Sequence, residues 1–239
     1  MTEQIFDVHF LLETFPKIMP YYPITMAIVG VALVFGLLIG FFCALIRIYH
    51  VRILTTIVNI YISIVRGTPL LIQLYLFYYG IPISLRLLNA KFQTNFNIDG
   101  VSPLWCVLIS YSLNEGAYQT ETIRGAIESV DQGEVEAAYS IGLTGAQTLR
   151  RIIIPEAVKI AIPNLGNNLL KLFKNTSLAF TVSVVDIMAE GKLIGSEGYR
   201  YFEVYIALAV IYWVSCFVIS KVVDVIELRV NVAGKRIAR

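Results

Sequence analysis

The sequence has little charge and few of the residues from which catalytic and metal sites are built. Asp, Glu, Lys and Arg make up 15% of the 239 residues, against roughly 25% in a soluble domain. His9 and His50 are isolated from one another, and no His/Cys/Asp cluster has metal-ligand spacing. The three cysteines lie in apolar runs without paired spacing, which is typical of small buried hydrophobic residues. We therefore expect neither a metal site nor a disulfide framework.

Nucleotide-binding and nucleophile motifs are missing as well. The chain contains neither G-x-x-x-x-G-K-[ST] nor G-x-G-x-x-G, the glycine-rich patterns that cradle nucleotide phosphates. No Ser/His/Asp arrangement stands out, and the net charge of +2 is too small to indicate a nucleic-acid partner. We predict that the chain is not an enzyme, has no ATPase site of its own and needs no cofactor.

Apolar residues are abundant instead. Hydrophobic residues make up 57% of the chain, and the mean hydropathy is +0.71. These values predict an all-α, polytopic membrane protein, and the length suits five or six spans of about 20 residues each. We place five transmembrane helices in one membrane domain, 1–239, with a short interfacial segment at 1–20 that Pro16, Pro20 and Pro23 separate from the first span. The predicted spans are 24–46, 53–82, 104–127, 155–183 and 201–225.

The first two predicted spans contain helix-packing and helix-breaking signals. Gly36 and Gly40 form a G-x-x-x-G pattern, which lets a neighbouring backbone approach closely. Arg66-Gly67-Thr68-Pro69 divides the second span into two halves, each too short to cross a membrane alone. Because broken membrane helices often border a substrate path, we interpret the break as functional. The alternative is a proline kink with Arg66 reaching for the membrane surface.

Polar residues recur at helical spacing on spans 3 and 4. On span 3 they follow intervals of four, four and three, and on span 4 intervals of four, three and four, so each set lies on one helix face. Ionisable residues at membrane depth normally face the protein interior or a water-filled cavity. The alternative is hydrogen bonding between packed helices. The two stripes are Ser110, Asn114, Tyr118 and Glu121, and Asn164, Asn168, Lys171 and Asn175.

Lysine and arginine in the connections predict the orientation, because they accumulate on the cytoplasmic side. One side has nine of them against five on the other, which places the N-terminus outside and the C-terminus in the cytoplasm. The first side carries Arg47, Arg52, Arg124, Arg150, Arg151, Arg229, Lys235, Arg236 and Arg239. The second carries Lys17, Arg86, Lys91, Lys192 and Arg200.

A polar, small-residue segment, 136–155, lies between spans 3 and 4 on the predicted cytoplasmic side. The run from Glu134 to Ala138 favours a helix, Gly142 favours a sharp turn, and Thr144 is a good N-cap for a second short helix. Ala137, Ala138 and Gly142 have little side-chain bulk, which suits docking in a groove on a partner. We predict a coupling loop at 134–151, and the alternative is an ordinary helical hairpin.

This segment resembles the cytoplasmic signature E-A-A-x3-G-x9-I-x-L-P of permease subunits of ATP-binding-cassette importers. It matches at Glu136, Ala137, Ala138, Gly142, Ile152 and Pro155, and it differs in having Ile154 for the Leu. The stretches IVRGTPLLIQLYLFYYG and LGNNLLKLFKNTSLAFTVSV are similar to the polar amino acid uptake branch. The resemblance implies a permease of the bacterial cytoplasmic membrane that pairs with itself or with a related chain. It also implies two cytoplasmic ATPase subunits and an extracytoplasmic substrate-binding protein as partners.

The resemblance also implies a substrate cavity around the break and the two polar stripes. The residues at the break would bind the carboxylate of an amino acid, those on span 3 its ammonium or side-chain groups, and those on span 4 its side chain. The predicted ATPase-docking residues are Glu136, Ala137, Ala138 and Gly142. The predicted substrate-binding residues are Arg66, Thr68, Asn114, Tyr118, Glu121, Asn168, Lys171 and Asn175.

The charge of the span-4 stripe narrows the substrate. No acidic residue lies between Lys159 and Val185, which disfavours a cationic amino acid. Glutamine and cystine both fit, with a slight preference for cystine. Two other classes remain: an ion-coupled secondary transporter, although no internal repeat is evident, and a structural or signalling membrane subunit in which the stripes only hold helices together.

Overall fold

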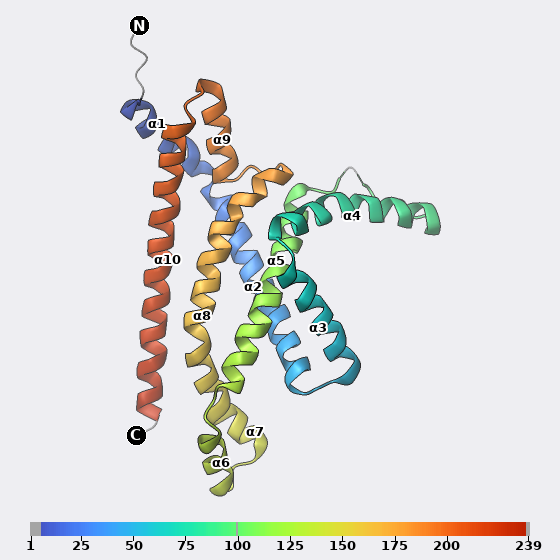
Figure 1. Cartoon of the computed structure of the whole chain (residues 1–239), viewed down its shortest axis with the longest axis vertical. Coiled ribbons are helices and arrows are strands. Elements are labelled where there is room, and N and C mark those ends of the chain that lie inside the picture. Colours follow the sequence, from blue (N-terminus) through green and yellow to red (C-terminus); the bar gives the residue numbers. More distant parts are fainter. Residues whose placement is uncertain (1–5, 99, 238–239) are drawn as a thin grey trace.

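The computed structural model describes residues 6–98 and 100–237, and all regular structure in that part of the chain is helical (Figure 1). Short 3₁₀ segments at Met19–Tyr21 and Thr176–Val182 and a π-helical turn at Leu149–Ile153 extend neighbouring helices. The α-helices are α1 Val8–Ile18, α2 Tyr22–Ile48, α3 Arg52–Gly67, α4 Leu70–Phe92, α5 Pro103–Glu128, α6 Gln132–Ser140, α7 Gly145–Thr148, α8 Ile154–Asn175, α9 Ile187–Gly198 and α10 Tyr201–Ile237.

The predicted spans correspond to α2, the pair α3 and α4, α5, α8 and α10, so the all-α prediction is confirmed. Three stretches are long and apolar enough to cross a membrane by length and composition alone: Val8–Ile48, Leu70–Phe92 and Tyr201–Val230. Helices α5 and α8 are not among them, because both carry the polar stripes. In α5 these polar side chains turn inward, and Asn114, Glu115, Gln119 and Thr120 are all buried.

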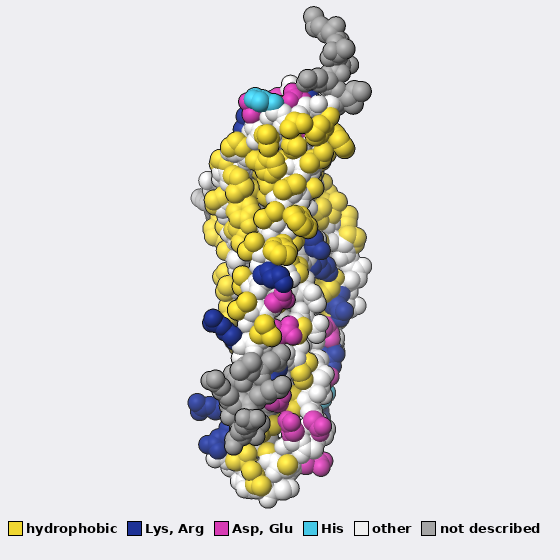
Figure 2. Space-filling view, turned by 90° about the vertical axis from the view of Figure 1, so that its left-hand side faces the viewer, with side chains coloured by type: hydrophobic (Ala, Val, Ile, Leu, Met, Phe, Trp, Pro, Cys, Tyr) yellow, Lys and Arg dark blue, Asp and Glu magenta, His cyan; other side chains and the backbone are white. Residues whose placement is uncertain are grey.

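The long helices run along one axis and leave polar elements at both ends (Figure 1). Helices α6 and α7 lie at the same end as the C-terminal part of α10, and α1 and α9 lie at the opposite end. On the face shown in Figure 2, hydrophobic side chains cover most of the upper half below a small charged group at the top edge, whereas acidic and basic side chains are spread from the middle to the lower end. This division matches a membrane-facing surface that ends in a charged, water-facing region.

Close contact between α2 and α5 forms the centre of the bundle. A Cβ atom added to Gly36 would lie 2.6 Å from Glu115 Cβ, and one added to Gly40 would lie 2.6 Å from Gln119 Cβ. These glycines therefore let the two backbones approach, as their G-x-x-x-G spacing predicts. Next to this contact, Ile28, Leu74, Tyr111, Leu172 and Phe173 bring α2, α4, α5 and α8 into one apolar core.

The prolines near the N-terminus do not interrupt the helical backbone, so the predicted break before the first span is wrong. Helix α1 passes through the 3₁₀ turn directly into α2. Pro20 and Pro23 are each the second residue of a helical segment, a position in the first turn where the missing amide hydrogen is tolerated. Residues 1–5 of the predicted interfacial segment lie outside the described residues.

Ionic contacts fasten α1 to the start of α10. The Asp7 backbone amide donates to Glu203 Oε1 over 3.1 Å, and Arg200 Nη1 lies 3.7 Å from Asp7 Oδ2. Hydrogen bonds from the backbone amides of Phe10 and His9, together with the Arg200 guanidinium, hold the pKa of the Asp7 carboxyl below its ordinary value. These contacts link the N-terminal segment to the end of the bundle opposite α6 and α7.

Two connections are more helical than the sequence suggested. Helix α4 continues ten residues beyond Pro82 and projects sideways from the bundle (Figure 1). The segment after Asp186, which lies between the predicted spans 155–183 and 201–225, forms α9. The Asp186 carboxylate caps this helix by accepting from the amides of Met188 and Ala189, and Ile187 and Ile194 pack against α10. Short helices with one apolar side give little periodic signal in a single sequence.

Candidate functional site

The interruption of the second span lies between α3, which ends at Gly67, and α4, which begins at Leu70. Thr68 and Pro69 are extended, so the chain changes direction there, as predicted. Gln73 holds this break together. Its side-chain amide donates to the carbonyl oxygens of Val65 and Thr68 over 2.8 and 3.1 Å and to Thr68 Oγ1 over 2.9 Å. These bonds satisfy carbonyl groups that the end of α3 leaves without a helical partner.

Gln73 also ties the break to α5. Its side-chain oxygen accepts from Asn114 Nδ2 over 2.9 Å, and both side chains are buried. Thr68 and Asn114, two of the predicted site residues, are therefore linked through a third residue that the sequence did not single out. The Thr68 hydroxyl itself donates to the Ile64 carbonyl. Thr68 and Asn114 therefore help to hold the conformation of the break, and Arg66 is the charged residue next to it.

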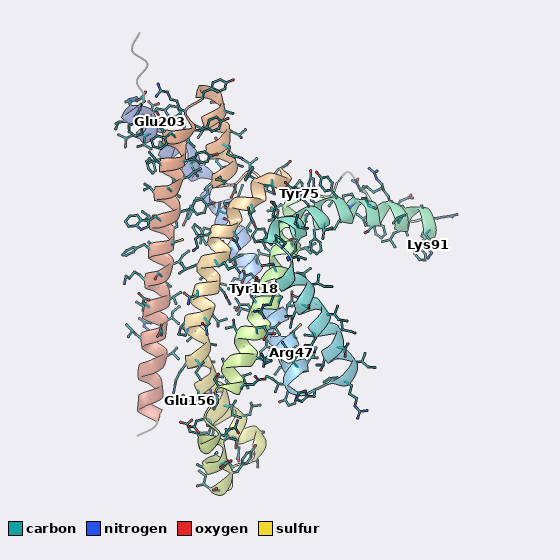
Figure 3. All side chains as sticks on the ribbon, in the orientation of Figure 1. Arg47, Tyr75, Lys91, Tyr118, Glu156 and Glu203 are labelled. Atoms are coloured by element: carbon teal, nitrogen blue, oxygen red, sulfur yellow. The ribbon has the colours of Figure 1, made fainter. Side chains whose placement is uncertain are left out.

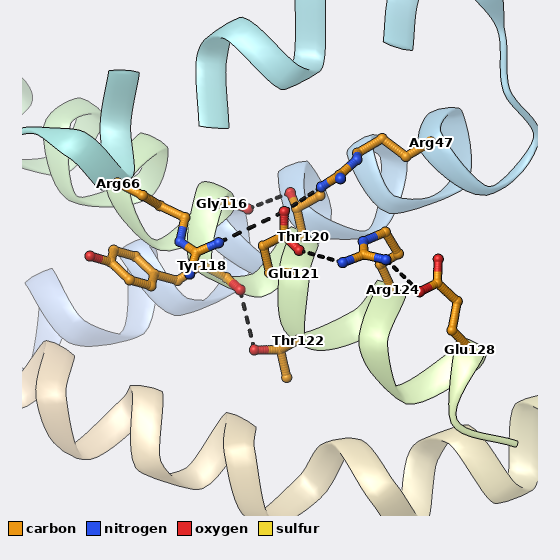
Figure 4. A network of polar contacts seen from close by, with 9 residues as sticks. All are labelled: Arg47, Arg66, Gly116, Tyr118, Thr120, Glu121, Thr122, Arg124 and Glu128. Carbon is orange, nitrogen blue, oxygen red and sulfur yellow. Dashed lines mark hydrogen bonds and ion pairs between the residues drawn. The ribbon is translucent and has the colours of Figure 1, made fainter. Parts of the chain in front are cut away.

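Glu121 is the centre of an ion-pair network that joins three helices (Figure 4). Its carboxylate pairs with Arg47 of α2, lies 2.8 Å from Arg124 Nη2 of α5, and lies 3.8 Å from Arg66 Nη1 of α3. Arg124 also pairs with Glu128. A carboxylate shared by three guanidinium groups has its charge compensated, which explains how Glu121 is accommodated on a helix of the bundle. The prediction that Glu121 meets a ligand ammonium is not tested by these contacts.

Tyr118 lies one turn before this network, midway along the bundle (Figure 3). Two cations contact its ring: Arg66 Cζ is 5.6 Å from the ring centre, and Lys171 Nζ is 3.8 Å from it. Both distances fall within the range of cation–π attraction. The break, the span-3 stripe and the span-4 stripe thus meet at one aromatic ring. We call Arg66, Tyr118, Glu121 and Lys171 the charged cluster.

The remaining stripe residues have other positions. Asn168 Nδ2 donates to Gln119 Oε1 and Thr122 Oγ1 over 3.3 and 3.1 Å, so it links α8 to α5 beside the charged cluster. Asn175 ends α8, and its backbone carbonyl accepts from the Tyr111 hydroxyl over 2.5 Å. Of the eight predicted substrate-binding residues, the structure therefore brings four together in the charged cluster. Three more, Thr68, Asn114 and Asn168, make side-chain hydrogen bonds between or within neighbouring helices, and Asn175 lies at the end of α8.

The predicted coupling loop forms two short helices joined by a tight turn. Asp131 caps α6, and Gly142 adopts φ +85° after it, a left-handed conformation that favours glycine. Thr144 and Gln147 form a reciprocal capping box at the start of α7. A π-helical turn then carries α7 into α8 without a break. The helix, turn and N-cap predicted from the sequence are all present.

One residue of the predicted docking surface faces the other way. Ala138 is only 4% exposed, because helical spacing places it on the same side of α6 as Val135, which packs against α5 and α8. Glu136, Ala137 and Gly142 are exposed. The hairpin also exposes two large apolar side chains that no sequence pattern singled out, Tyr139 at 53% and Ile141 at 79% exposure. Exposed apolar residues at a polar end of a protein often mark a partner surface.

An all-helical bundle with an interrupted span, charges clustered beside that interruption and a helical hairpin at one end defines a membrane-embedded transport subunit. Residues 36–232 match the family described as the inner membrane component of binding-protein-dependent transport systems. The chain belongs to this family.

Individual relatives agree with this assignment over nearly their whole length. The chain is 36% identical over 235 residues to the L-cystine transport system permease protein TcyL of Bacillus subtilis, covering 98% of this chain and 96% of that protein. It is 37% identical over 231 residues to the probable amino-acid ABC transporter permease protein PatM of Vibrio harveyi, covering 97% and 99%. The crystal structure of an amino acid ABC transporter with histidines superimposes with a TM-score of 0.81 at 31% identity, covering 95% and 100%.

Proposed function

We propose that the chain moves a polar, neutral or zwitterionic amino acid across the cytoplasmic membrane by alternating access, driven by partner ATPases. The observation that carries this proposal is the charged cluster, which lies at the helix break midway along the bundle. The Arg66 side chain is 45% exposed, and Lys171 is exposed on the flank of the described chain. Charged groups at membrane depth need water or protein around them rather than lipid.

The exposure of these charges supports pairing with a second permease subunit. A second copy or a related chain that covers this flank would enclose the charged cluster in a shared, water-filled path. The two chains would then border the substrate from both sides, as expected for a rigid-body change between inward-facing and outward-facing states. We infer from the positive-inside distribution that the end with α6 and α7 faces the cytoplasm and the end with α1 and α9 faces the outside.

The hairpin at the cytoplasmic end is the proposed docking element for two ATPase subunits. Glu136 and Ala137 are exposed on α6, and Tyr139 and Ile141 extend the same element with apolar surface. Because α7 runs through the π-helical turn into α8, movement of the hairpin would be transmitted directly to a helix of the charged cluster. An extracytoplasmic binding protein would deliver the ligand at the opposite end.

The substrate is proposed to be cystine or glutamine rather than a cationic amino acid. The ligand-facing charges of the cluster are cationic, since Glu121 is already shared by three arginines. An arginine or lysine side chain would meet repulsion there, whereas a ligand carboxylate would be attracted. The similarity to an L-cystine permease supports the same choice.

Ligand-dependent ATP hydrolysis tests this proposal. The permease with its ATPase subunits and binding protein is reconstituted in nanodiscs and tested with cystine, glutamine, arginine and lysine. We expect cystine or glutamine to raise the rate of ATP hydrolysis, with arginine and lysine having little effect. Stimulation by arginine alone would contradict the proposed substrate class.

Replacing Gln73 with leucine is expected to raise the KM for uptake about tenfold, with the basal ATPase rate unchanged within about twofold. The substitution leaves the buried Asn114 amide without its acceptor and the carbonyls of Val65 and Thr68 without their donor, a cost of about 1–3 kcal/mol. The break that positions Arg66 then loosens. Uptake is measured in proteoliposomes, with Leu76→Ala as the control, because Leu76 lies on the same helix and is 65% exposed. An unchanged KM in Gln73→Leu would show that Gln73 does not position the cluster.

A further inference from the structure

Two cationic side chains approach one aromatic ring from different helices. Arg66 comes from the end of α3 and Lys171 from α8, and their charged centres lie 5.6 and 3.8 Å from the centre of the Tyr118 ring. The two centres are therefore separated by no more than the sum of these distances, 9.4 Å. Like charges this close repel one another. The attraction of each cation to the Tyr118 ring offsets part of this repulsion.

Neither cation has a close carboxylate of its own. Arg66 Nη1 is 3.8 Å from Glu121 Oε1, but that carboxylate has closer partners in Arg47 and Arg124. Lys171 makes no ion pair within 4 Å among residues 6–98 and 100–230. Glu115 is close enough to interact electrostatically with Lys171, but its side chain is buried against α2 and accepts from Gln119 over 3.3 Å.

The charge count around Tyr118 is positive. Four cationic side chains from four helices meet three carboxylates, of which one is buried in the contact between α2 and α5. The two cations at the ring are the ones left with the weakest compensation. The cations are Arg47, Arg66, Arg124 and Lys171, and the carboxylates are Glu115, Glu121 and Glu128.

We propose that the transported amino acid carries two carboxylates, one bound by Arg66 and the other by Lys171, the two cations that contact the Tyr118 ring. This inference rests on the proposed function and narrows its substrate class. A ligand with two carboxylates compensates both cations, and each contact is a charge-assisted hydrogen bond. A ligand with a single carboxylate, such as glutamine, leaves one of the two cations without a carboxylate partner. The geometry therefore favours a dicarboxylic amino acid of the cystine type over glutamine.

Equilibrium binding to the permease–ATPase complex tests the inference without the selectivity of a binding protein. The complex in nanodiscs is titrated with cystine, with diaminopimelate, which has two amino acid ends and no disulfide, and with glutamine, in the absence of thiols. We expect both dicarboxylic ligands to bind at least about tenfold more tightly than glutamine, in line with one additional charge-assisted hydrogen bond.

Variants at position 171 identify the residue responsible. Lys171→Gln is expected to weaken binding of cystine and diaminopimelate about 10-fold to 100-fold and to change glutamine binding by less than about threefold. Lys171→Arg keeps the charge and is expected to keep the preference. Lys174→Gln is the matched control, because Lys174 is exposed on the same helix and makes no contact with the Tyr118 ring.

The outcomes separate this inference from the proposed function. Equal affinity for glutamine and cystine, or equal losses for all ligands in Lys171→Gln with recovery in Lys171→Arg, would overturn the two-carboxylate assignment while leaving an amino acid permease. If none of the three ligands binds the wild-type complex, and none stimulates ATP hydrolysis with the binding protein present, the proposed function itself fails.

Discussion

Replacing Gly142 with proline is expected to abolish amino acid uptake, by about 100-fold or more, while the permease still inserts and assembles. Gly142 has φ +85°, whereas the proline ring fixes φ near −65°. The substitution also removes the amide that donates to the Tyr139 carbonyl over 2.9 Å. The angle between α6 and α7 would be lost, and with it the route by which ATPase movement reaches α8. Uptake, membrane insertion and basal ATP hydrolysis are measured in the same preparation.

Asparagine at position 142 is the matched control, because it tolerates the left-handed conformation that proline cannot adopt. We expect Gly142→Asn to retain uptake within about threefold of the wild type. Uptake that survives in Gly142→Pro would show that the turn is not part of the coupling path. Glu136→Arg is expected to give the same loss for a different reason, since it reverses an exposed charge on α6 without changing the backbone.

Replacing Gly40 with valine is expected to remove most of the folded permease. A Cβ atom at this position would lie 2.6 Å from Gln119 Cβ and 3.0 Å from both the Gln119 carbonyl carbon and the Thr120 amide nitrogen. Two of these atoms belong to the α5 backbone, so no side-chain rotation relieves the clash, and α2 must move away from α5. We expect a loss of several kcal/mol of stability, read as a lower Tm and a smaller monodisperse peak in size-exclusion chromatography.

Gly30→Ala provides the comparison on the same helix. A Cβ atom at Gly30 has no neighbour within 4 Å, and alanine favours helix over glycine by about 1 kcal/mol. The Tm of Gly30→Ala should therefore equal or exceed that of the wild type. If Gly40→Val melts within a degree or two of Gly30→Ala, the close contact between α2 and α5 does not support the fold.

The features that could be predicted from the sequence are those encoded by local chemistry or by helical spacing. Arg66-Gly67-Thr68-Pro69 breaks the helix because Pro69 has no amide hydrogen to donate and its ring forces the preceding Thr68 into an extended conformation. Gly142 and Thr144 determine the turn and cap of the hairpin in the same way. The spacing of Tyr118 and Lys171 placed each on a polar face, and the structure shows that these two faces meet.

The missed features depend on which elements lie side by side. Gln73 is a single polar residue in an apolar stretch, so no periodicity pointed to its bonds with the end of α3 and with Asn114. Arg47 looked like part of a basic loop, yet it pairs with Glu121. Ala138 belongs to a small-residue motif, and only the packing of α6 shows that it faces the bundle. An acidic residue on a predicted span, with several arginines nearby in the sequence, is the one sequence signal that would have suggested the ion-pair network.

Uptake into proteoliposomes under controlled energy sources tests most directly whether transport is driven by partner ATPases. Liposomes contain either the lone chain or the chain with its ATPase subunits, and the binding protein and radiolabelled cystine are added outside. We expect uptake only when the ATPase subunits and internal ATP are present, independent of proton or sodium gradients. Uptake by the lone chain driven by an ion gradient, without ATP, would contradict it and identify a secondary transporter instead.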